Sequence, residues 1–156
     1  MTLASFNSAP AAQARAAMLD CCGSTRFADA MTAGRPYPSP SDAERAAQAI
    51  FATMTWDDVR EALDRHPRIG ARVSGASAAE QSGVGEESRA ALAAGNAAYE
   101  ERFGHVFLIC ATGVSGDQLL AALRRRLASD ESSERVVAAA ELGKITVLRL
   151  RKALAG

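Results

Sequence analysis

The chain has 156 residues, which is enough for one domain with a core of its own. Its 18 Lys and Arg residues balance 18 Asp and Glu residues, and this zero net charge argues against a general attraction to nucleic acid or anionic membranes. With two histidines, three cysteines and no C-x-x-C pair, a zinc site is not expected. The odd cysteine count, with Cys21 beside Cys22, predicts free thiols and therefore a reducing cytoplasm.

The composition is typical of a helical protein, because alanine is abundant and aromatic residues make up only 5%. Asn7 and Ser8 are expected to cap a first helix that ends near residue 23. Ser24 is expected to cap a second helix that ends at Gly34. The prolines of residues 35–40 predict a loop.

The middle of the chain contains two helix starts and a long loop. Ser41-Asp-Ala-Glu44 resembles a capping box that begins a third helix, and Thr55-Trp-Asp-Asp58 begins a fourth. This fourth helix should end before His66, because a residue that precedes proline avoids the helical conformation. Glycine and serine recur over residues 70–85, so we expect a loop there with at most a short helical turn.

Four more segments complete the prediction. Residues 86–103 form a long helix closed by Gly104, and residues 105–111 form a short, buried, extended segment without a partner strand. Ser115-Gly-Asp-Gln118 begins a helix to about residue 128, and the last helix runs over residues 132–153. Its apolar stripe is expected at Val137, Ala140, Ile145 and Leu148. The chain is therefore predicted to be all-α, with about six to eight helices in a single compact domain over residues 1–156.

Two residues have side chains suited to proton transfer. His66 lies between a helix end and a loop, and Pro67 restricts the backbone beside it. An imidazole can accept or donate a proton near neutral pH, although His66 is also placed to stabilise a helix C-terminus. Glu80 matches a capping box that starts at Ser77, and its spacing alone favours that structural role over catalysis.

One arginine, Arg149, is a candidate anion-binding residue. Arg149 is flanked by two leucines, which indicates partial burial, and a buried guanidinium needs an anion such as a carboxylate.

The run from Arg124 to Arg126 is interpreted as a solvated helix face, and Cys110 as a packed thiol. Main-chain groups of residues 106–111, having no partner strand, could bind the amide-like edge of a heterocycle.

Taken together, these pieces resemble one family, the decarboxylases of 2-oxo-4-hydroxy-4-carboxy-5-ureidoimidazoline (OHCU). Each motif alone is weak, but the ordered set is specific and covers nearly the whole chain. The residues that carry the resemblance are His66-Pro-Arg-Ile-Gly70, Ser77, Glu80-Gln81, Asn96, Tyr99, Phe103-Gly104, Phe107, Ile109-Cys110-Ala111, Leu123, Arg126-Leu127, Glu134, Glu141, Lys144-Ile145 and Leu148-Arg-Leu150.

The resemblance implies a single all-helical domain that converts OHCU to (S)-allantoin in urate breakdown, without a metal or organic cofactor. The family's catalytic residues fall on His66, Glu80 and Arg149. Its substrate-binding residues fall on Pro67, Ser77, Gln81 and the main-chain groups of Phe107 and Ile109. It also implies a small-molecule substrate and a possible homodimer, with no nucleic acid or membrane as partner.

Two other classes of protein are weighed against this enzyme. Alanine-rich amphipathic helices would also suit a non-catalytic helical interaction module, but such a module does not need the His66-Pro67 turn or a buried arginine. A nucleic-acid-binding domain would have to use residues 124–126, and zero net charge with few aromatic residues argues against it.

Overall fold

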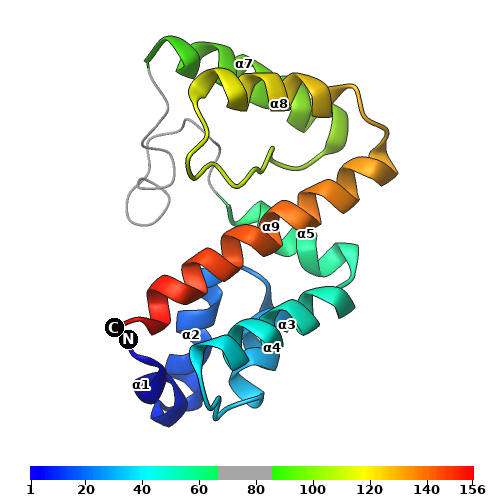
Figure 1. Cartoon of the computed structure of the whole chain (residues 1–156). Coiled ribbons are helices and arrows are strands. Elements are labelled where there is room, and N and C mark those ends of the chain that lie inside the picture. Colours follow the sequence, from blue (N-terminus) through cyan, green and yellow to red (C-terminus); the bar gives the residue numbers. More distant parts are fainter. Residues whose placement is uncertain (67–85) are drawn as a thin grey trace. The chain divides into compact units, whose positions relative to one another are not determined.

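The computed structural model describes residues 1–66 and 86–156. Within these ranges the chain forms eight α-helices and no β-strand, which confirms the predicted all-α fold (Figure 1). The helices are α1 (Leu3–Ser8), α2 (Ala11–Cys21), α3 (Thr25–Ala33), α4 (Pro40–Thr53), α5 (Trp56–Asp64), α7 (Glu86–Phe103), α8 (Gly116–Leu127) and α9 (Glu131–Leu154). They belong to two compact units, of which the first holds Met1–Ala62 with Leu142–Gly156 and the second holds Leu63–Glu141.

The start of the chain differs from the prediction, because Thr2 caps the first helix in place of Asn7 or Ser8. Thr2 and Ser5 form a reciprocal capping box, with hydrogen bonds of 3.1 Å and 2.8 Å between their hydroxyls and main-chain N–H groups. The chain leaves the helix before Pro10, which has no N–H to donate, and a new helix begins after it. The predicted helix corresponds to α2, which begins after Pro10 without a side-chain cap, and α1 was not predicted.

The next two helices follow the expected capping rules, with one shift. Ser24 caps α3 and Gly34 ends it, as predicted. Helix α4 begins earlier than expected, because the Ser39 hydroxyl accepts a hydrogen bond of 3.2 Å from the N–H three residues later. Pro40 takes the first helical position, where its missing N–H leaves no hydrogen bond unmade. The predicted cap at Ser41 and the assignment of Pro40 to a loop are wrong.

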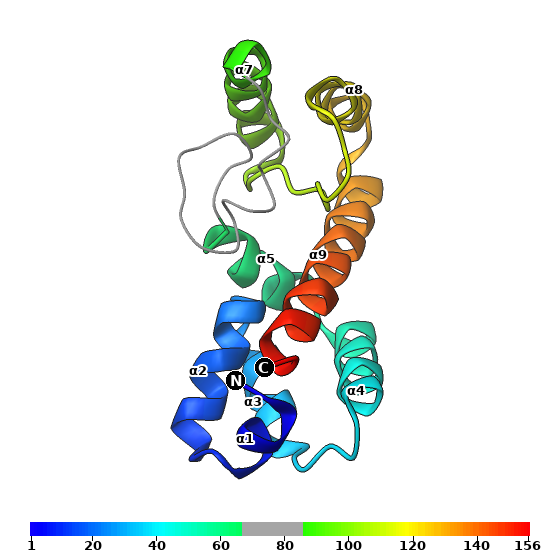
Figure 2. The ribbon, with the colours of Figure 1, turned by 60° about the vertical axis from the view of Figure 1, so that its left-hand side comes forward.

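In the first unit, α3 lies against both α2 and α4 (Figures 1 and 2). Helix α4 also contacts α9, where Glu44 accepts a charged hydrogen bond of 2.6 Å from Arg151. An antiparallel bridge between Thr2 and Ala155 brings the two ends of the chain together. The interior is closed by fully buried side chains, including Phe6, Met18, Phe27 and Met31.

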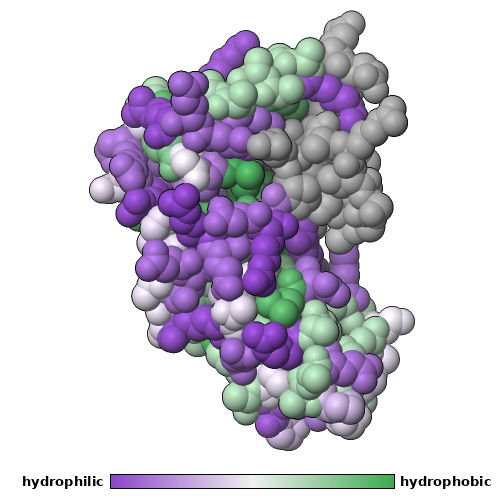
Figure 3. Space-filling model, turned by 180° about the vertical axis from the view of Figure 1, so that it is seen from behind, coloured by the Kyte–Doolittle hydropathy of each residue, from purple (hydrophilic) through white to green (hydrophobic). Residues whose placement is uncertain are grey.

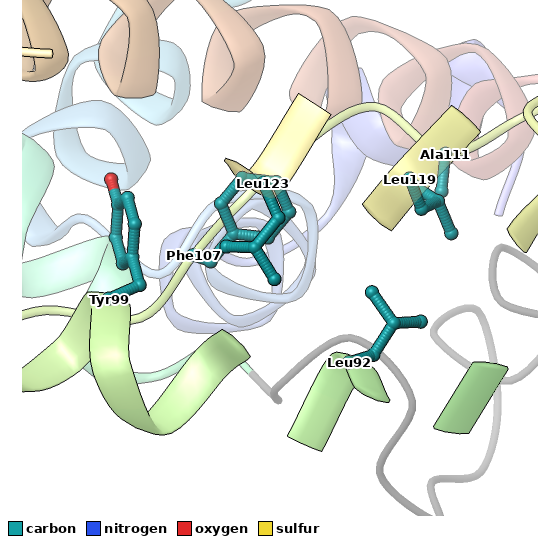
Figure 4. Packing of buried hydrophobic residues seen from close by; sticks show 6 residues of the cluster. All are labelled: Leu92, Tyr99, Phe107, Ala111, Leu119 and Leu123. Atoms are coloured by element: carbon teal, nitrogen blue, oxygen red, sulfur yellow. The ribbon is translucent and has the colours of Figure 1, made fainter. Parts of the chain in front are cut away.

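In the second unit, α7 and α8 lie side by side and enclose a second hydrophobic cluster (Figure 4). Helix α7 ends at Gly104, whose φ of 78° suits glycine because it has no Cβ. Helix α8 begins at the predicted capping box of Ser115 and Gln118. The cluster consists of Leu92, Tyr99, Phe107, Ala111, Leu119 and Leu123. Helix bounds were therefore predicted well here, since caps and a C-terminal glycine mark them locally.

Helix α9 begins and ends within one residue of its predicted bounds, but its predicted apolar stripe is partly wrong. Val137 is 40% exposed and Ala140 is exposed, whereas Ile145 is buried as expected. The buried face includes two carboxylates, Glu134 and Glu141. Hydrophobic periodicity missed this face because charged residues occupy it.

The surface has mixed polarity. On the face drawn in Figure 3, hydrophilic and hydrophobic residues are interspersed and the most hydrophobic surface is confined to small patches. Among the described residues the exposed large hydrophobic side chains are those of Met1, Val136 and Val137. No helix within residues 1–66 or 86–156 is both long and apolar enough to cross a membrane.

Candidate functional site

His66 lies just beyond the end of α5, as the His-Pro pair predicts. Its main-chain N–H donates a hydrogen bond of 3.1 Å to the carbonyl of Leu63, so the last turn of the helix leads directly to it. The residue is half-buried. The main chain of His66 is therefore held at a helix end while the residue stays partly exposed, which suits a group that exchanges protons with a ligand.

Arg149 lies on α9 in the first unit and is half-buried, as its leucine neighbours predict. Its positive charge acts on the thiols of Cys21 and Cys22, lowering both pKa values. Burial outweighs this effect, so it raises the pKa of Cys21 from 9.0 to about 11 and also raises the pKa of Cys22. Both thiols are therefore protonated and uncharged near neutral pH.

The segment between α7 and α8 is non-helical over residues 105–115, as predicted. Its Phe107 and Leu108 side chains are fully buried, and Ile109 is half-buried against the hydrophobic cluster. Figure 4 shows Phe107 together with the other five residues of this cluster. These apolar contacts fix where the main chain of the segment runs.

Hydrogen bonds fix how that main chain is turned. The carbonyl of Leu108 accepts a hydrogen bond of 2.5 Å from Arg126 Nη1, and the N–H of Cys110 donates one of 3.4 Å to Glu141 Oε1. This spacing of two residues fits the extended segment that the sequence predicts, and alternate residues of an extended chain present their N–H and C=O groups to opposite edges. Leu108 and Cys110 are thus bound on one edge, and the main-chain groups of Phe107 and Ile109 belong to the other.

The other edge makes no hydrogen bond to the part of the chain that the structure describes. No hydrogen bond from residues 1–66 or 86–156 reaches the main-chain N–H or C=O of Phe107 or Ile109. Main-chain donors and acceptors alternating along one edge can pair with a ligand that carries both N–H and C=O groups, such as an imide or a urea. The geometry is therefore suited to the main-chain role that the sequence resemblance implies for these two residues.

Arg126 was predicted to be solvated, and this prediction is wrong. The side chain is only 10% exposed, and its Nε donates to Glu134 Oε1 at 2.7 Å. Its guanidinium carbon also lies 4.6 Å from the centre of the Phe107 ring and 5.9 Å from that of Tyr99. The Tyr99 hydroxyl donates to the same carboxylate, and burial with this hydrogen bond raises the pKa of Tyr99.

A signal for this buried arginine was present in the sequence. Arg126 follows Leu119 and Leu123 by seven and three residues, which places it on the same helical face as those two buried leucines. Reading residues 124–126 as one charge run hid this position. Arg124 and Arg125 are exposed, as predicted.

Four of the residues implied by the resemblance, namely Pro67, Ser77, Glu80 and Gln81, lie outside the described residues. His66 belongs to the second unit and Arg149 to the first. The convergence of an imidazole, a carboxylate and a guanidinium in one pocket therefore stays a prediction. Within the described ranges no group of His, Cys, Asp and Glu residues is placed to hold a metal ion.

Comparison with known proteins decides the family. The model of the OHCU decarboxylase family matches residues 7–151. The chain belongs to the OHCU decarboxylase family.

Two curated relatives of this family member cover most of its length. The uric acid degradation bifunctional protein TTL of Arabidopsis thaliana is 34% identical over 144 residues, which are 85% of this chain and 44% of that protein. The chain thus spans less than half of this longer relative. The 2-oxo-4-hydroxy-4-carboxy-5-ureidoimidazoline decarboxylase of Amia calva is 30% identical over 135 residues, which are 80% of this chain and 77% of that protein.

Two solved structures share the fold of this family member. A crystal structure of an OHCU decarboxylase in the presence of (S)-allantoin superposes with a TM-score of 0.80 and 31% identity, covering 88% of this chain and 96% of that one. A crystal structure of an (S)-allantoin synthase gives a TM-score of 0.72 with 21% identity, covering 99% of this chain and 54% of that one. The second likeness shows a common fold.

Proposed function

We propose that this chain is a cofactor-independent carboxy-lyase that converts OHCU to (S)-allantoin in urate breakdown. The observation that carries the proposal is the likeness, at 31% identity and nearly full coverage of both chains, to an OHCU decarboxylase crystallised in the presence of (S)-allantoin. The family match over residues 7–151 supports the same activity.

The substrate can decarboxylate without help from a cofactor. The carbon that carries the carboxylate lies next to a ring C=N, so the electron pair of the breaking C–C bond forms a new C=C bond while the ring nitrogen takes up a proton. Carbon dioxide leaves and an enol remains. The enol then loses its hydroxyl proton and gains a proton at the ureido-bearing carbon, which gives allantoin. The enzyme need only orient the carboxylate and transfer protons.

We assign roles to His66, Glu80 and Arg149 in this reaction. His66 takes the hydroxyl proton or positions the hydroxyl, because an imidazole exchanges protons near neutral pH. Glu80 holds His66 and helps to transfer protons. Arg149 binds an anionic or ureido part of the substrate, and the partial burial of this residue supports the role.

Substrate orientation falls to Pro67, Ser77, Gln81 and the main-chain groups of Phe107 and Ile109. For the last two, support comes from the main-chain edge that no described residue occupies. A ureidoimidazoline presents both N–H and C=O groups, which match alternating main-chain acceptors and donors. Binding from one side then allows protonation of one face only, so the product is a single enantiomer.

The experiment uses freshly generated OHCU and follows circular dichroism at the wavelengths where allantoin absorbs. OHCU also decays unaided, but it then gives racemic allantoin with no net signal. A dichroic signal of (S)-allantoin that grows in proportion to enzyme concentration supports the proposal. Absence of any signal above the uncatalysed control overturns it and favours a non-catalytic helical interaction module.

We further propose that the chain acts as one domain over residues 1–156. The family match runs through both compact units, which supports a single functional module. Calorimetry should then show one transition, whose calorimetric and van't Hoff enthalpies agree. Two separate transitions would contradict it.

We also propose a homodimer in a reducing cytoplasm. Val136 and Val137, 71% and 40% exposed on α9, supply apolar surface for a second copy, and the free thiols suit a reducing compartment. Light scattering during gel filtration measures the mass directly. A monomeric mass at micromolar concentration would contradict the dimer.

A further inference from the structure

We infer that Arg126 and Glu134 are positioning residues for the reaction, because together they hold the main-chain edge of Phe107 and Ile109 in its binding orientation. This inference deepens the proposed function and rests on it. Neither side chain touches that edge. They act from the opposite side of the segment, through the carbonyl of Leu108.

The contacts of Arg126 link three parts of the second unit. Its Nη1 donates to Leu108 of the segment, while its Nε donates to Glu134 of α9. The guanidinium also lies against the ring of Phe107, at 4.6 Å from its centre. The rigid plane of one guanidinium therefore fixes both the rotation of the main chain at Leu108 and the position of the residue before it.

Glu134 keeps the guanidinium in this orientation. Its side chain is fully buried, and its Oε1 accepts from both Arg126 and the hydroxyl of Tyr99. Tyr99 in turn packs edge-on against Phe107 at 5.3 Å between ring centres. The carboxylate is thus held by two donors, and the arginine cannot turn away from Leu108 without losing its charged partner.

A purely structural role explains this pair poorly. Desolvating two charges costs about as much as their attraction returns, and an apolar pair of similar volume often serves a core equally well. What an apolar pair cannot supply is a directed donor to the Leu108 carbonyl. With Glu141 holding the N–H of Cys110, two restraints fix one edge, and the opposite edge makes no hydrogen bond to the described residues.

The first experiment compares Arg126→Lys with Arg124→Lys, an exposed arginine on the same helix. Lysine keeps the charge near Glu134 but loses the planar fork that reaches Leu108 at the same time. For Arg126→Lys we expect the KM for OHCU to rise about ten-fold, the value of one hydrogen-bonded contact, with kcat changed less than about two-fold. Arg124→Lys should match the parent in both constants.

This division between KM and kcat separates positioning from stability. A variant that is merely less stable has fewer active molecules, so its apparent kcat falls while its KM stays unchanged. If the parent chain is active and Arg126→Lys has the same KM as the parent, the inference is overturned and the proposed function stays intact.

A second variant covers the case in which the single substitution fails to fold. Arg126→Met combined with Glu134→Gln removes both charges, and the amide still accepts from the Tyr99 hydroxyl. Its melting temperature should exceed that of Arg126→Met alone, while its KM stays about ten-fold above the parent value, since Leu108 still lacks its donor. A parental KM in this variant also overturns the inference.

Hydrogen exchange supplies a readout that needs no turnover. In Arg126→Lys, amides over residues 105–111 should exchange faster than in the parent while amides within α7 and α8 keep their protection. Equal exchange in both proteins contradicts the restraint itself. If the parent chain gives no (S)-allantoin signal, the proposed function is overturned, and so is the role of Arg126 and Glu134 in it. Hydrogen exchange still shows in that case whether Arg126 and Glu134 hold residues 105–111 in place.

Discussion

Arg126 and Glu134 form an ion pair with an N–O distance of 2.5 Å, although their side chains are only 10% and 0% exposed. Removing one partner leaves the other charge buried without compensation. We therefore predict that Glu134→Ala lowers the free energy of unfolding by about 3–5 kcal/mol. Urea denaturation at neutral pH measures this loss.

The control for that prediction is another glutamate–arginine pair on α9. Glu131 contacts Arg135 at 2.6 Å, but their side chains are 65% and 43% exposed. Because water and salt screen such a pair, Glu131→Ala should cost less than about 0.5 kcal/mol. Equal losses in the two variants would show that burial does not strengthen the Arg126 pair.

Replacing either of two helical glycines by alanine should change the stability of the protein, but in opposite directions. An added Cβ at Gly95 of α7 would lie 2.4 Å from Leu123 Cδ2, whereas one at Gly143 of α9 would meet Phe51 no closer than 3.7 Å. Leu123 is fully buried, so it has little room to move. Gly95→Ala should therefore destabilise the protein by about 1–3 kcal/mol.

Gly143→Ala should instead stabilise it by about 0.5–1 kcal/mol, because alanine favours the helix and its methyl group makes an ordinary contact. Thermal unfolding of both variants and the parent measures these changes as shifts in melting temperature. A higher melting temperature for Gly95→Ala would mean that α7 and α8 can separate slightly without loss.

The buried thiol of Cys21 predicts a loss of stability at alkaline pH. Its pKa rises from the 9.0 of an ordinary cysteine to about 11 in the fold, where burial disfavours the thiolate. The folded chain thus holds this proton more tightly than the unfolded chain. Its contribution is complete below pH 9 and is lost as the pH rises to about 11, at a cost of about 2 kcal/mol.

The matched variant is Cys21→Ala, followed by urea denaturation between pH 8 and pH 11. Its free energy of unfolding should fall less steeply with pH than that of the parent. Some slope remains, because burial also raises the pKa of Cys22 and of Tyr99. Identical slopes in the two proteins would contradict the raised pKa of Cys21.

Local chemistry explains which parts of the fold could be predicted. Helices α7 and α8 are bounded by Gly104 and the capping box at Ser115, signals that act within a few residues, and their predicted bounds hold. The start of α4 was misplaced because Ser39 and Ser41 are both good caps. Pro40 decides between them, since proline fits the first helical position better than a loop.

The burial of the polar residues could not be predicted from such local signals. Charge and periodicity describe one helix at a time, whereas the burial of Arg126 depends on Glu134 of α9 and on the Leu108 carbonyl. Only the family resemblance singled out Phe107 and Ile109. The structure adds a physical reason, because Leu108 and Cys110 are bound on the other edge.

The imidazole of His66 is the group whose loss should affect turnover most. We predict that His66→Ala lowers kcat/KM for enantioselective allantoin formation by about 10²–10⁴-fold, the usual value of a general acid or base. The helical dichroism should not change, since the residue lies beyond the end of α5. A variant that still forms (S)-allantoin at the parental rate would remove His66 from the mechanism.

The last prediction separates the two roles open to Glu80. A glutamine there keeps a side chain that can accept and donate hydrogen bonds in a capping box with Ser77, but it cannot take up a proton. If Glu80 takes part in proton transfer, Glu80→Gln should lower kcat by about 10²-fold or more with little change in melting temperature. If the carboxylate is only a cap, turnover should be close to parental. Glu80→Ala completes the comparison, because losing the cap costs about 1 kcal/mol of stability whichever role is correct.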